Sequence, residues 1–210
     1  MEEEYIVDMQ GFKQPNNDYI LKELAIVPVN EDSEPLVFLF KPPYAWGKLN
    51  IDLMEVNNWL KWYHHGIPWN SGNIPYRKIG YILRECLNDA KRVIVKGSIN
   101  KEWLKRFKFN VHDIQEMGFT GLDKLHDQKP LLVCPHHNGA YNTACAIRNV
   151  KLLKKFYKEN KPSLERSISI FNQARHLSFM QPRDIEQLPK DFIIENASYS
   201  IEYGFDILPE

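Results

Sequence analysis

The sequence predicts an α/β fold, a mixed five-stranded sheet flanked by helices and followed by a helical C-terminal extension. Two observations lead to this prediction. Three β-rich segments separated by short turns open the chain, as in an antiparallel meander. After them, segments with apolar residues at helical spacing alternate with short β-branched runs. The 210 residues, of which 43% are hydrophobic, are sufficient to build such a core.

Aliphatic, aromatic and β-branched residues predict the three opening strands over residues 5–8, 19–29 and 36–40. The polar turn from Pro15 to Asp18 separates the first strand from the second. A proline-bearing loop and an aromatic-rich stretch over residues 53–65 follow the third strand.

The rest of the chain alternates helices and strands. Apolar periodicity predicts helices over residues 79–87, 101–107 and 144–156, and short apolar runs predict strands over 92–96 and 131–134. We expect residues 1–161 to form one domain and residues 162–210 to form an irregular or helical tail packed on it, because Pro182 and Pro189 interrupt the pattern.

Charge and cysteine content narrow the classes of function. The chain carries 27 basic and 27 acidic residues, so no overall field draws it to nucleic acid or to a membrane, although a local basic patch stays open. No run approaches the roughly 18 apolar residues that span a bilayer, and the start lacks the features of a secretory signal. With three cysteines, an odd number, we expect an intracellular location, cytoplasm or nucleus, and thiols that are free or metal-bound.

Several motifs, taken in order, resemble the DEDDh exonucleases of the RNase H-like superfamily. The similar segments are Tyr5–Gln10 for the first strand's Asp-x-Glu, Glu23–Val27 for the second strand, His65–Ile67, Val93–Gly97, and Ala144–Asn149 for the family's His-x-Ala-x-x-Asp helix. The resemblance covers about residues 5–157 and implies an RNase H-like fold. Each motif alone is weak, and their order is the specific part.

The resemblance also shows where the catalytic carboxylates of such an exonuclease are missing. Asp8 is retained, but the partner Glu is Gln10, the third acid falls at Asn100 or Lys101, the last Asp at Asn149, and the His base at Ala144. Two-metal hydrolysis needs several carboxylates around a pair of metal ions. We therefore expect a pseudo-nuclease rather than an exonuclease. Asp8 would then hold one weak metal ion or cap a turn.

The Maelstrom proteins, RNA-silencing factors of animal germ cells, form a branch of this superfamily that this chain is similar to. That branch lost the acidic cluster and has a zinc site of Glu, His or Cys, His and Cys. The resemblance implies a structural zinc ion held by Glu23, Cys134, His137 and Cys145, with His136 as an alternative to its neighbour. The competing interpretation is two buried small cysteines, a loop histidine and a Glu23 that faces solvent.

Basic and aromatic side chains suggest a nucleic-acid interface. The candidates for phosphate contacts are Lys96, Lys101, Lys105, Arg106, Arg148, Lys151 and Lys155. Trp59, Trp62, Tyr63, Trp69 and Tyr76 are candidates for base stacking, of which we expect about half to be core. Solvated helix faces remain the alternative for the basic residues.

Three functions stay open at the level of sequence. The first is a pseudo-nuclease with a structural zinc ion that binds nucleic acid, most of all single-stranded RNA, or scaffolds protein partners. The second is an RNA nuclease with a rebuilt site, and the third is a pure protein-interaction module. No membrane association is expected.

Overall fold

The computed structural model describes residues 3–15, 18–117, 119, 121–122, 136–137 and 144–177, with side chains described as far as residue 162. By its internal contacts the chain divides into two units, Met1–Glu159 and Asn160–Glu210. The sheet and all the site residues discussed below belong to the first unit. In the second unit, residues 160–177 are helical. The predicted packing of a tail on the domain stays a prediction.

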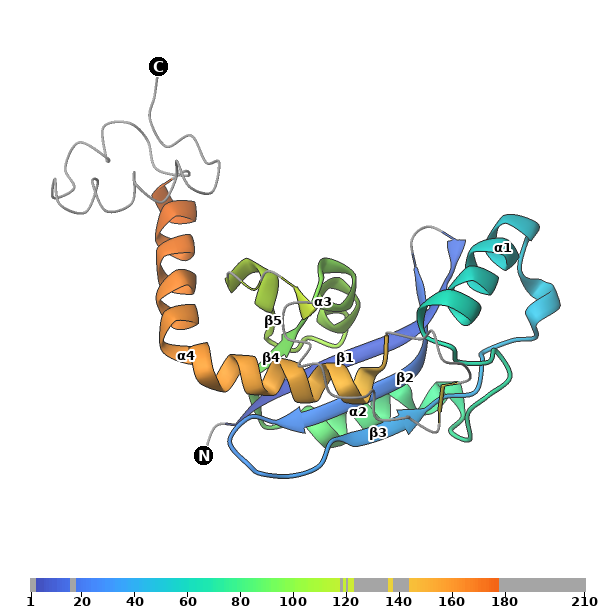
Figure 1. Ribbon diagram of the computed structural model, residues 1–210, viewed down its shortest axis with the longest axis horizontal. Helices are drawn as coiled ribbons and strands as arrows, with labels where there is room; N and C mark the ends of the chain where they lie inside the picture. Colours follow the sequence, from blue (N-terminus) through green and yellow to red (C-terminus); the bar gives the residue numbers. More distant parts are fainter. Residues whose placement is uncertain are drawn as a thin grey trace, which may run out of the picture. The chain divides into compact units, whose positions relative to one another are not determined.

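Five strands form one mixed sheet, with the order β3-β2-β1-β4-β5 (Figure 1). Their bounds are Glu3–Lys13 for β1, Tyr19–Pro28 for β2, Leu36–Leu39 for β3, Ala90–Val95 for β4 and Val111–Asp113 for β5. The first three strands are antiparallel neighbours, whereas β4 pairs parallel with β1 and β5 parallel with β4. The predicted α/β fold with a mixed five-stranded sheet is confirmed.

In the described part of the chain, four α-helices accompany the sheet. They are α1 over Ile51–Trp59, α2 over Ile79–Leu87, α3 over Ser98–Lys105 and α4 over Ala146–Leu177. The sequence predicted α2 at its observed bounds because its apolar residues repeat at helical spacing and line one buried side. A five-residue π-helix, Leu60–His64, continues α1.

Two elements differ from the sequence-based expectation. The fifth strand is Val111–Asp113, which the sequence did not reveal because three residues are too few to show a period. The segment 131–134, predicted as that strand, lies outside the described residues. Helix α4 also extends well beyond the predicted residues 144–156, through Pro162, into the segment for which an irregular or helical tail was expected. A proline inside a helix removes one hydrogen bond and tends to kink the helix at that point.

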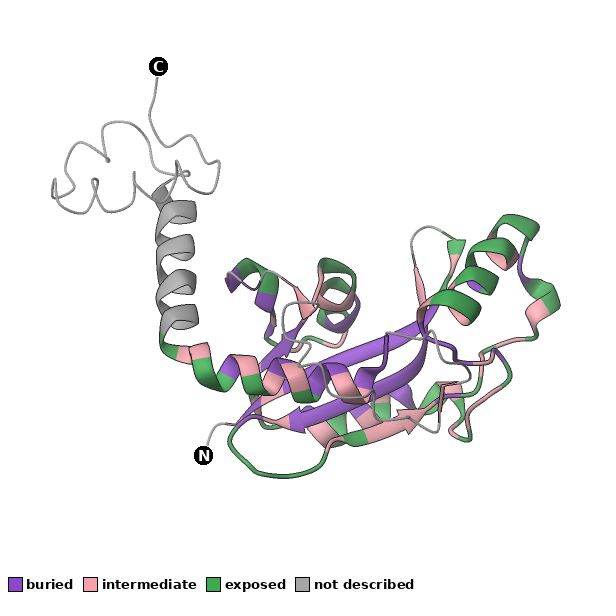
Figure 2. Cartoon of the chain, in the orientation of Figure 1, coloured by how far each residue is buried: buried purple, intermediate pink, exposed green. Residues whose placement is uncertain are grey.

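The alternation of side chains along β1 assigns its two faces to different helices. Val7 and Met9 join the main apolar cluster that α2 and α3 cover. The intervening residues face α4, since Asn149 of α4 donates to Asp8 and the Tyr157 hydroxyl donates to Glu4. Figure 2 shows the central strands buried along most of their length, as expected for a sheet covered on both faces.

A bulge in the middle of the β1–β2 pair changes the course of β2. The register runs from Gln10 opposite Glu23 directly to Gly11 opposite Leu21, which leaves Lys22 as the extra residue. Gly11 is required here, because a Cβ would lie 2.0 Å from the Ile20 carbonyl oxygen. The buried Lys22 ammonium donates to three carbonyl oxygens, at 2.6 to 2.8 Å, and so joins β2 to the loop that follows β3 and to residues 69–71.

Candidate metal centre and adjoining pocket

Two buried carboxylates, Asp8 and Glu23, lie on the sheet face that α4 covers. Gln10 pairs with Glu23 across the two strands, and Asp8 is two residues before Gln10, on the same side of β1. The side chains of both acids are almost completely removed from solvent, with residue exposures of 3% and 0%. A buried charge needs a partner, so the surroundings of each carboxylate indicate its chemistry.

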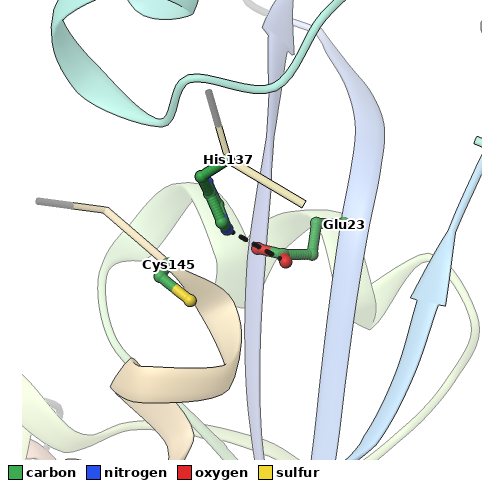
Figure 3. A group of neighbouring side chains, drawn as sticks. All are labelled: Glu23, His137 and Cys145. Carbon is green, nitrogen blue, oxygen red and sulfur yellow. Dashed lines mark hydrogen bonds and ion pairs between the residues drawn. The ribbon is translucent and has the colours of Figure 1, made fainter. Parts of the chain in front are cut away.

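Glu23, His137 and Cys145 converge on one point (Figure 3). Their donor atoms, a carboxylate oxygen, an imidazole nitrogen and the thiol sulfur, all lie within 4.8 Å of one another. Tetrahedral zinc bonds of about 2.0 to 2.3 Å separate ligand atoms by roughly 3.5 Å, so only small shifts would bring the three atoms to bonding positions. This group is a candidate metal-binding triad.

The start of α4 positions Cys145 and contacts Glu23. Cys145 precedes the first helical residue, and its carbonyl accepts the first helical hydrogen bond, from Asn149 at 2.9 Å. The Ala146 N–H, which has no partner inside the helix, donates to Oε2 of Glu23 at 2.9 Å. One carboxylate oxygen therefore caps the helix, where its charge is favourable, and Oε1 faces His137 at 3.1 Å.

His137 is oriented by a backbone carbonyl. Its Nδ1 donates to the carbonyl oxygen of His65, which directs Nε2 at Glu23. Such an outer partner is typical of metal-binding histidines, because it sets the tautomer and the ring orientation. Burial lowers the pKa of His137, but hydrogen bonds with Cys145 and Glu23 outweigh it and raise the pKa to about 10. The neighbours of His137 thus favour a cation at this position, and a metal ion would bind there in place of the Nε2 proton.

His65 supports this arrangement from the end of the π-helix. The ring is fully buried, its Nε2 donates to the Gly11 carbonyl at 3.1 Å, and its Nδ1 accepts from the Ile67 N–H at 3.0 Å. Burial and the neighbouring His64 lower the pKa of His65 to about 3. A neutral ring with one donor and one acceptor is what these two contacts require.

The structure brings together three of the four predicted metal ligands. Glu23 is buried rather than exposed on a strand edge, and the structure selects His137 over His136, which is not part of the group. Cys134, the predicted fourth ligand, lies outside the described residues. Cys86 packs against the main apolar cluster, far along the chain from the triad.

A pocket of about 790 Å³ adjoins the triad, and its size is typical of small-molecule sites. Ala144, next to the triad residue Cys145, forms part of its wall. The residues that the sequence resemblance places at the exonuclease catalytic positions meet in this pocket. They are Asp8, which the resemblance retains, and Gln10, Asn100, Ala144 and Asn149, which differ. Lys101 does not line it, and its ammonium contacts Glu116 at 2.7 Å instead.

Asp8 is held by amides rather than by cations. Gln10 and Asn149 each donate to its Oδ2 at 2.9 Å. Burial raises the pKa of Asp8 to about 7, although these two hydrogen bonds and the charge of Lys96 act in the opposite direction. Among the described residues, the other acid on the pocket wall is Asp18, which pairs with Arg106 at 2.6 Å. The pocket therefore lacks, over these residues, the acid cluster of a two-metal site.

The predicted basic surface is largely neutralised by nearby acids. The pairs are Lys101 with Glu116, Lys105 with Glu102, Arg106 with Asp18 and Lys151 with Glu34. Of the seven candidate phosphate contacts, Lys96 and Arg148 line the pocket, and Lys155 is exposed on α4. Of the predicted basic residues, Lys96 and Arg148 are thus the two placed on the pocket wall.

The aromatic residues divide between the core and the surface. Trp69 packs among Phe12, Trp46 and Tyr44, and Tyr76 contacts the same cluster. Trp59, Trp62 and Tyr63 are more than half exposed on α1 and the π-helix. The sequence did not predict the π-helix or the pocket-lining His64. It marked His65 only as part of the His65–Ile67 motif, and not as a support for the triad.

Comparison with models of known protein families yields no match to this chain, and comparison with curated proteins yields none either. Over the part of the chain that the structure describes, no helix combines the length and apolar character needed to cross a bilayer.

Proposed function

We propose that this protein is a catalytically degenerate member of the RNase H-like exonucleases that carries a structural zinc ion and binds single-stranded RNA. The observation that carries this proposal is the composition of one pocket. One retained acid, Asp8, and four positions at which the motifs differ from an exonuclease come from separate parts of the sequence and line a single cavity. The order of the elements, three strands followed by alternating helices and strands, supports the same relationship.

The pocket chemistry argues against exonuclease activity. Mg²⁺ prefers oxygen ligands with several carboxylates, whereas Asp8 lies between the amides of Gln10 and Asn149 and near the ammonium of Lys96. The ammonium of Lys96, next to the remaining acid, repels a divalent metal. Cations on the pocket wall such as Lys96 and Arg148 attract phosphate, so the pocket suits recognition of a nucleic-acid backbone better than its hydrolysis.

The triad supports the zinc part of the proposal. Carboxylate, imidazole and thiolate are borderline to soft donors that zinc accepts, and Cys134 is the predicted fourth ligand. Four protein ligands would close the site and make it structural, joining the start of α4 to β2 and the π-helix. Metal analysis of the purified protein should find about one zinc per chain, with Cys145→Ser losing it and Cys86→Ser, a partly buried cysteine away from the triad, retaining it.

Binding and cleavage assays test the RNA part. Single-stranded RNA should bind with an affinity that falls steeply as salt increases, because phosphate contacts release counterions. Incubation with Mg²⁺ or Mn²⁺ should produce no more cleavage than incubation with a chelator. Metal-stimulated shortening of the RNA from one end would contradict the proposal, and so would the absence of binding at low salt.

One observation favours a second candidate function, metal-independent RNA cleavage. The pKa of Asp8 is raised to about 7, mainly by burial, and a general acid or base works best with a pKa near the working pH. Cleavage that persists with chelator and disappears in Asp8→Asn would establish this alternative.

A further inference from the structure

The π-helix forms an exposed aromatic surface at the margin of the pocket. Its hydrogen bond from the His65 N–H to the Leu60 carbonyl spans five residues, at 3.0 Å. This wider turn brings residues five apart onto nearly the same side of the helix. The rings of Trp59 and His64 consequently stack, 6.1 Å between centroids and 16° between planes. Trp59 nevertheless remains 55% exposed, so much of its ring is available to a ligand.

The same short segment also forms part of the pocket wall. Leu60 and His64 line the cavity together with Lys96 and Arg148. Trp59, stacked on His64, is therefore continuous with the pocket rather than a separate hydrophobic patch. An aromatic ring next to a cavity that contains cations is the combination that single-stranded nucleic acids bind, with bases on the ring and phosphates at the cations.

The charge balance of the pocket favours a polyanion over a neutral or cationic partner. Lys13, Lys96 and Arg148 line the cavity. Of the two acids on the described part of its wall, Asp18 is paired with Arg106, and Asp8 accepts hydrogen bonds from two amides. Over the described residues, the wall therefore has more cationic than anionic side chains, although the whole chain is neutral. Lys61, with its ammonium 4.4 Å from the Trp62 ring centroid, adds a further cation on the aromatic surface.

We propose that this pocket seats a nucleotide of a single-stranded nucleic acid, its phosphate beside Lys96 and Arg148 and a base stacked on Trp59. This inference rests on the proposed function and assigns the nucleic acid to specific residues. It requires no metal in the pocket, because the cations of the protein replace the metal ions that hold the phosphate in a working exonuclease. Base stacking on Trp59 also requires unpaired bases, so a duplex is excluded.

The full chain with its bound metal should be titrated with a fluorescently labelled oligouridylate, with an abasic oligomer of the same length, and with the oligouridylate annealed to its complement. Wild type should bind the oligouridylate more tightly than either of the others. Trp59→Ala should weaken binding by roughly 5- to 150-fold and remove the preference over the abasic oligomer, as expected for the loss of one stacked base. Trp59→Phe should retain most of the affinity.

Two matched variants control for general surface effects. Tyr81 on α2 is also an exposed aromatic with a lysine near its ring, and Tyr81→Ala should bind as wild type does. Lys96→Gln should reduce the slope of log affinity against log salt by about 0.7, one phosphate contact on a single strand. Lys105→Gln, at a lysine paired with Glu102, should leave that slope unchanged.

The outcomes separate this inference from the proposed function. If wild type binds single-stranded RNA but Trp59→Ala and Lys96→Gln bind it equally well, the inference is wrong and the proposed function stands. Equal binding of the abasic oligomer and the oligouridylate by wild type would also overturn the inference. If wild type binds no single-stranded oligomer, both fail together. Circular dichroism of each variant distinguishes loss of binding from loss of fold.

Discussion

Glu23 and Asp8 are acids on the same face of neighbouring strands, both almost fully buried, yet their surroundings differ. Glu23 meets an imidazole, a thiol and the N-terminus of α4. Asp8 lies two residues from Gln10, the cross-strand partner of Glu23, and it meets the side-chain amides of Gln10 and Asn149. The difference teaches that burial alone does not define a metal site. The atoms that loops and helices bring to a carboxylate decide whether it is a candidate metal ligand or only a hydrogen-bond acceptor.

The largest effect on metal content and stability should come from a substitution in the triad around Glu23. His137→Ala should lose the bound metal and lower the melting temperature by roughly 10 °C or more, because binding free energy at a structural metal site is also folding free energy. His136→Ala, at the adjacent histidine outside the triad, should keep both. Metal analysis and calorimetry measure these two quantities, and an equal effect of the two variants would refute the assignment of His137.

An intermediate effect should come from removing the charge on the Asp8 side. The pKa of Asp8 rises from 3.8 to about 7, mainly through burial, so between these values the folded state holds a proton that the unfolded state has released. Stability therefore falls as pH rises through this window. An asparagine at this position does not titrate, so the Asp8→Asn variant does not lose this stability. The free energy of unfolding of Asp8→Asn minus that of wild type should therefore increase by about 2–3 kcal/mol from about pH 5 to about pH 8.

Urea unfolding of both proteins at the two pH values checks this prediction. His65, whose pKa is lowered to about 3, contributes the opposite trend, because its stabilisation is lost as pH falls below the unfolded value of 6.5. That contribution is common to both proteins and cancels in the difference. A difference that does not change with pH would show that Asp8 is ionised in the folded state throughout.

The smallest expected effect tests whether added carboxylates are enough to turn the surroundings of Asp8 into a metal site. The double variant Gln10→Glu, Asn149→Asp places two new acids beside Asp8. Mn²⁺ should then raise its melting temperature by about 2–4 °C, equivalent to about 1 kcal/mol, and should leave wild type unchanged. Adding Asp8→Asn should abolish the rise. A rise of the same size in wild type would mean that the amide-lined pocket already binds divalent metal, contrary to the comparison.

The fold was predictable where residues repeat over several turns or strand positions. The antiparallel meander and α2 follow from such patterns, because apolar residues alternate along a strand with one buried face and repeat about every 3.6 residues along a helix with one buried side. β5, with three residues, and the π-helix, with five, are too short to leave a pattern. Their positions depend on β4, which offers a free edge to β5, and on the hydrogen bonds that the π-helix makes with distant residues.

The candidate site was predictable only in part, and for the same reason. The family resemblance implied Glu23, His137 and Cys145 as ligands. It left Asn100 or Lys101 open for the third catalytic position, of which Asn100 lines the pocket, and it marked His65 only as part of a motif and His64 not at all. The sequence also suggested seven basic residues as phosphate contacts, whereas four of them pair with acids, three of these with acids distant in sequence, such as Arg106 with Asp18. Pairing across the fold cannot be read from local composition.

By itself, the sequence determined the periodicities that produce a covered mixed sheet and the residue types available to its sites, since these are local properties of the chain. Only the tertiary structure decided which residues share a site. A carboxylate on β2, a thiol before α4 and a histidine supported by the π-helix carbonyl converge because three separate elements pack together. The convergence comes from long-range packing, and no local spacing encodes it.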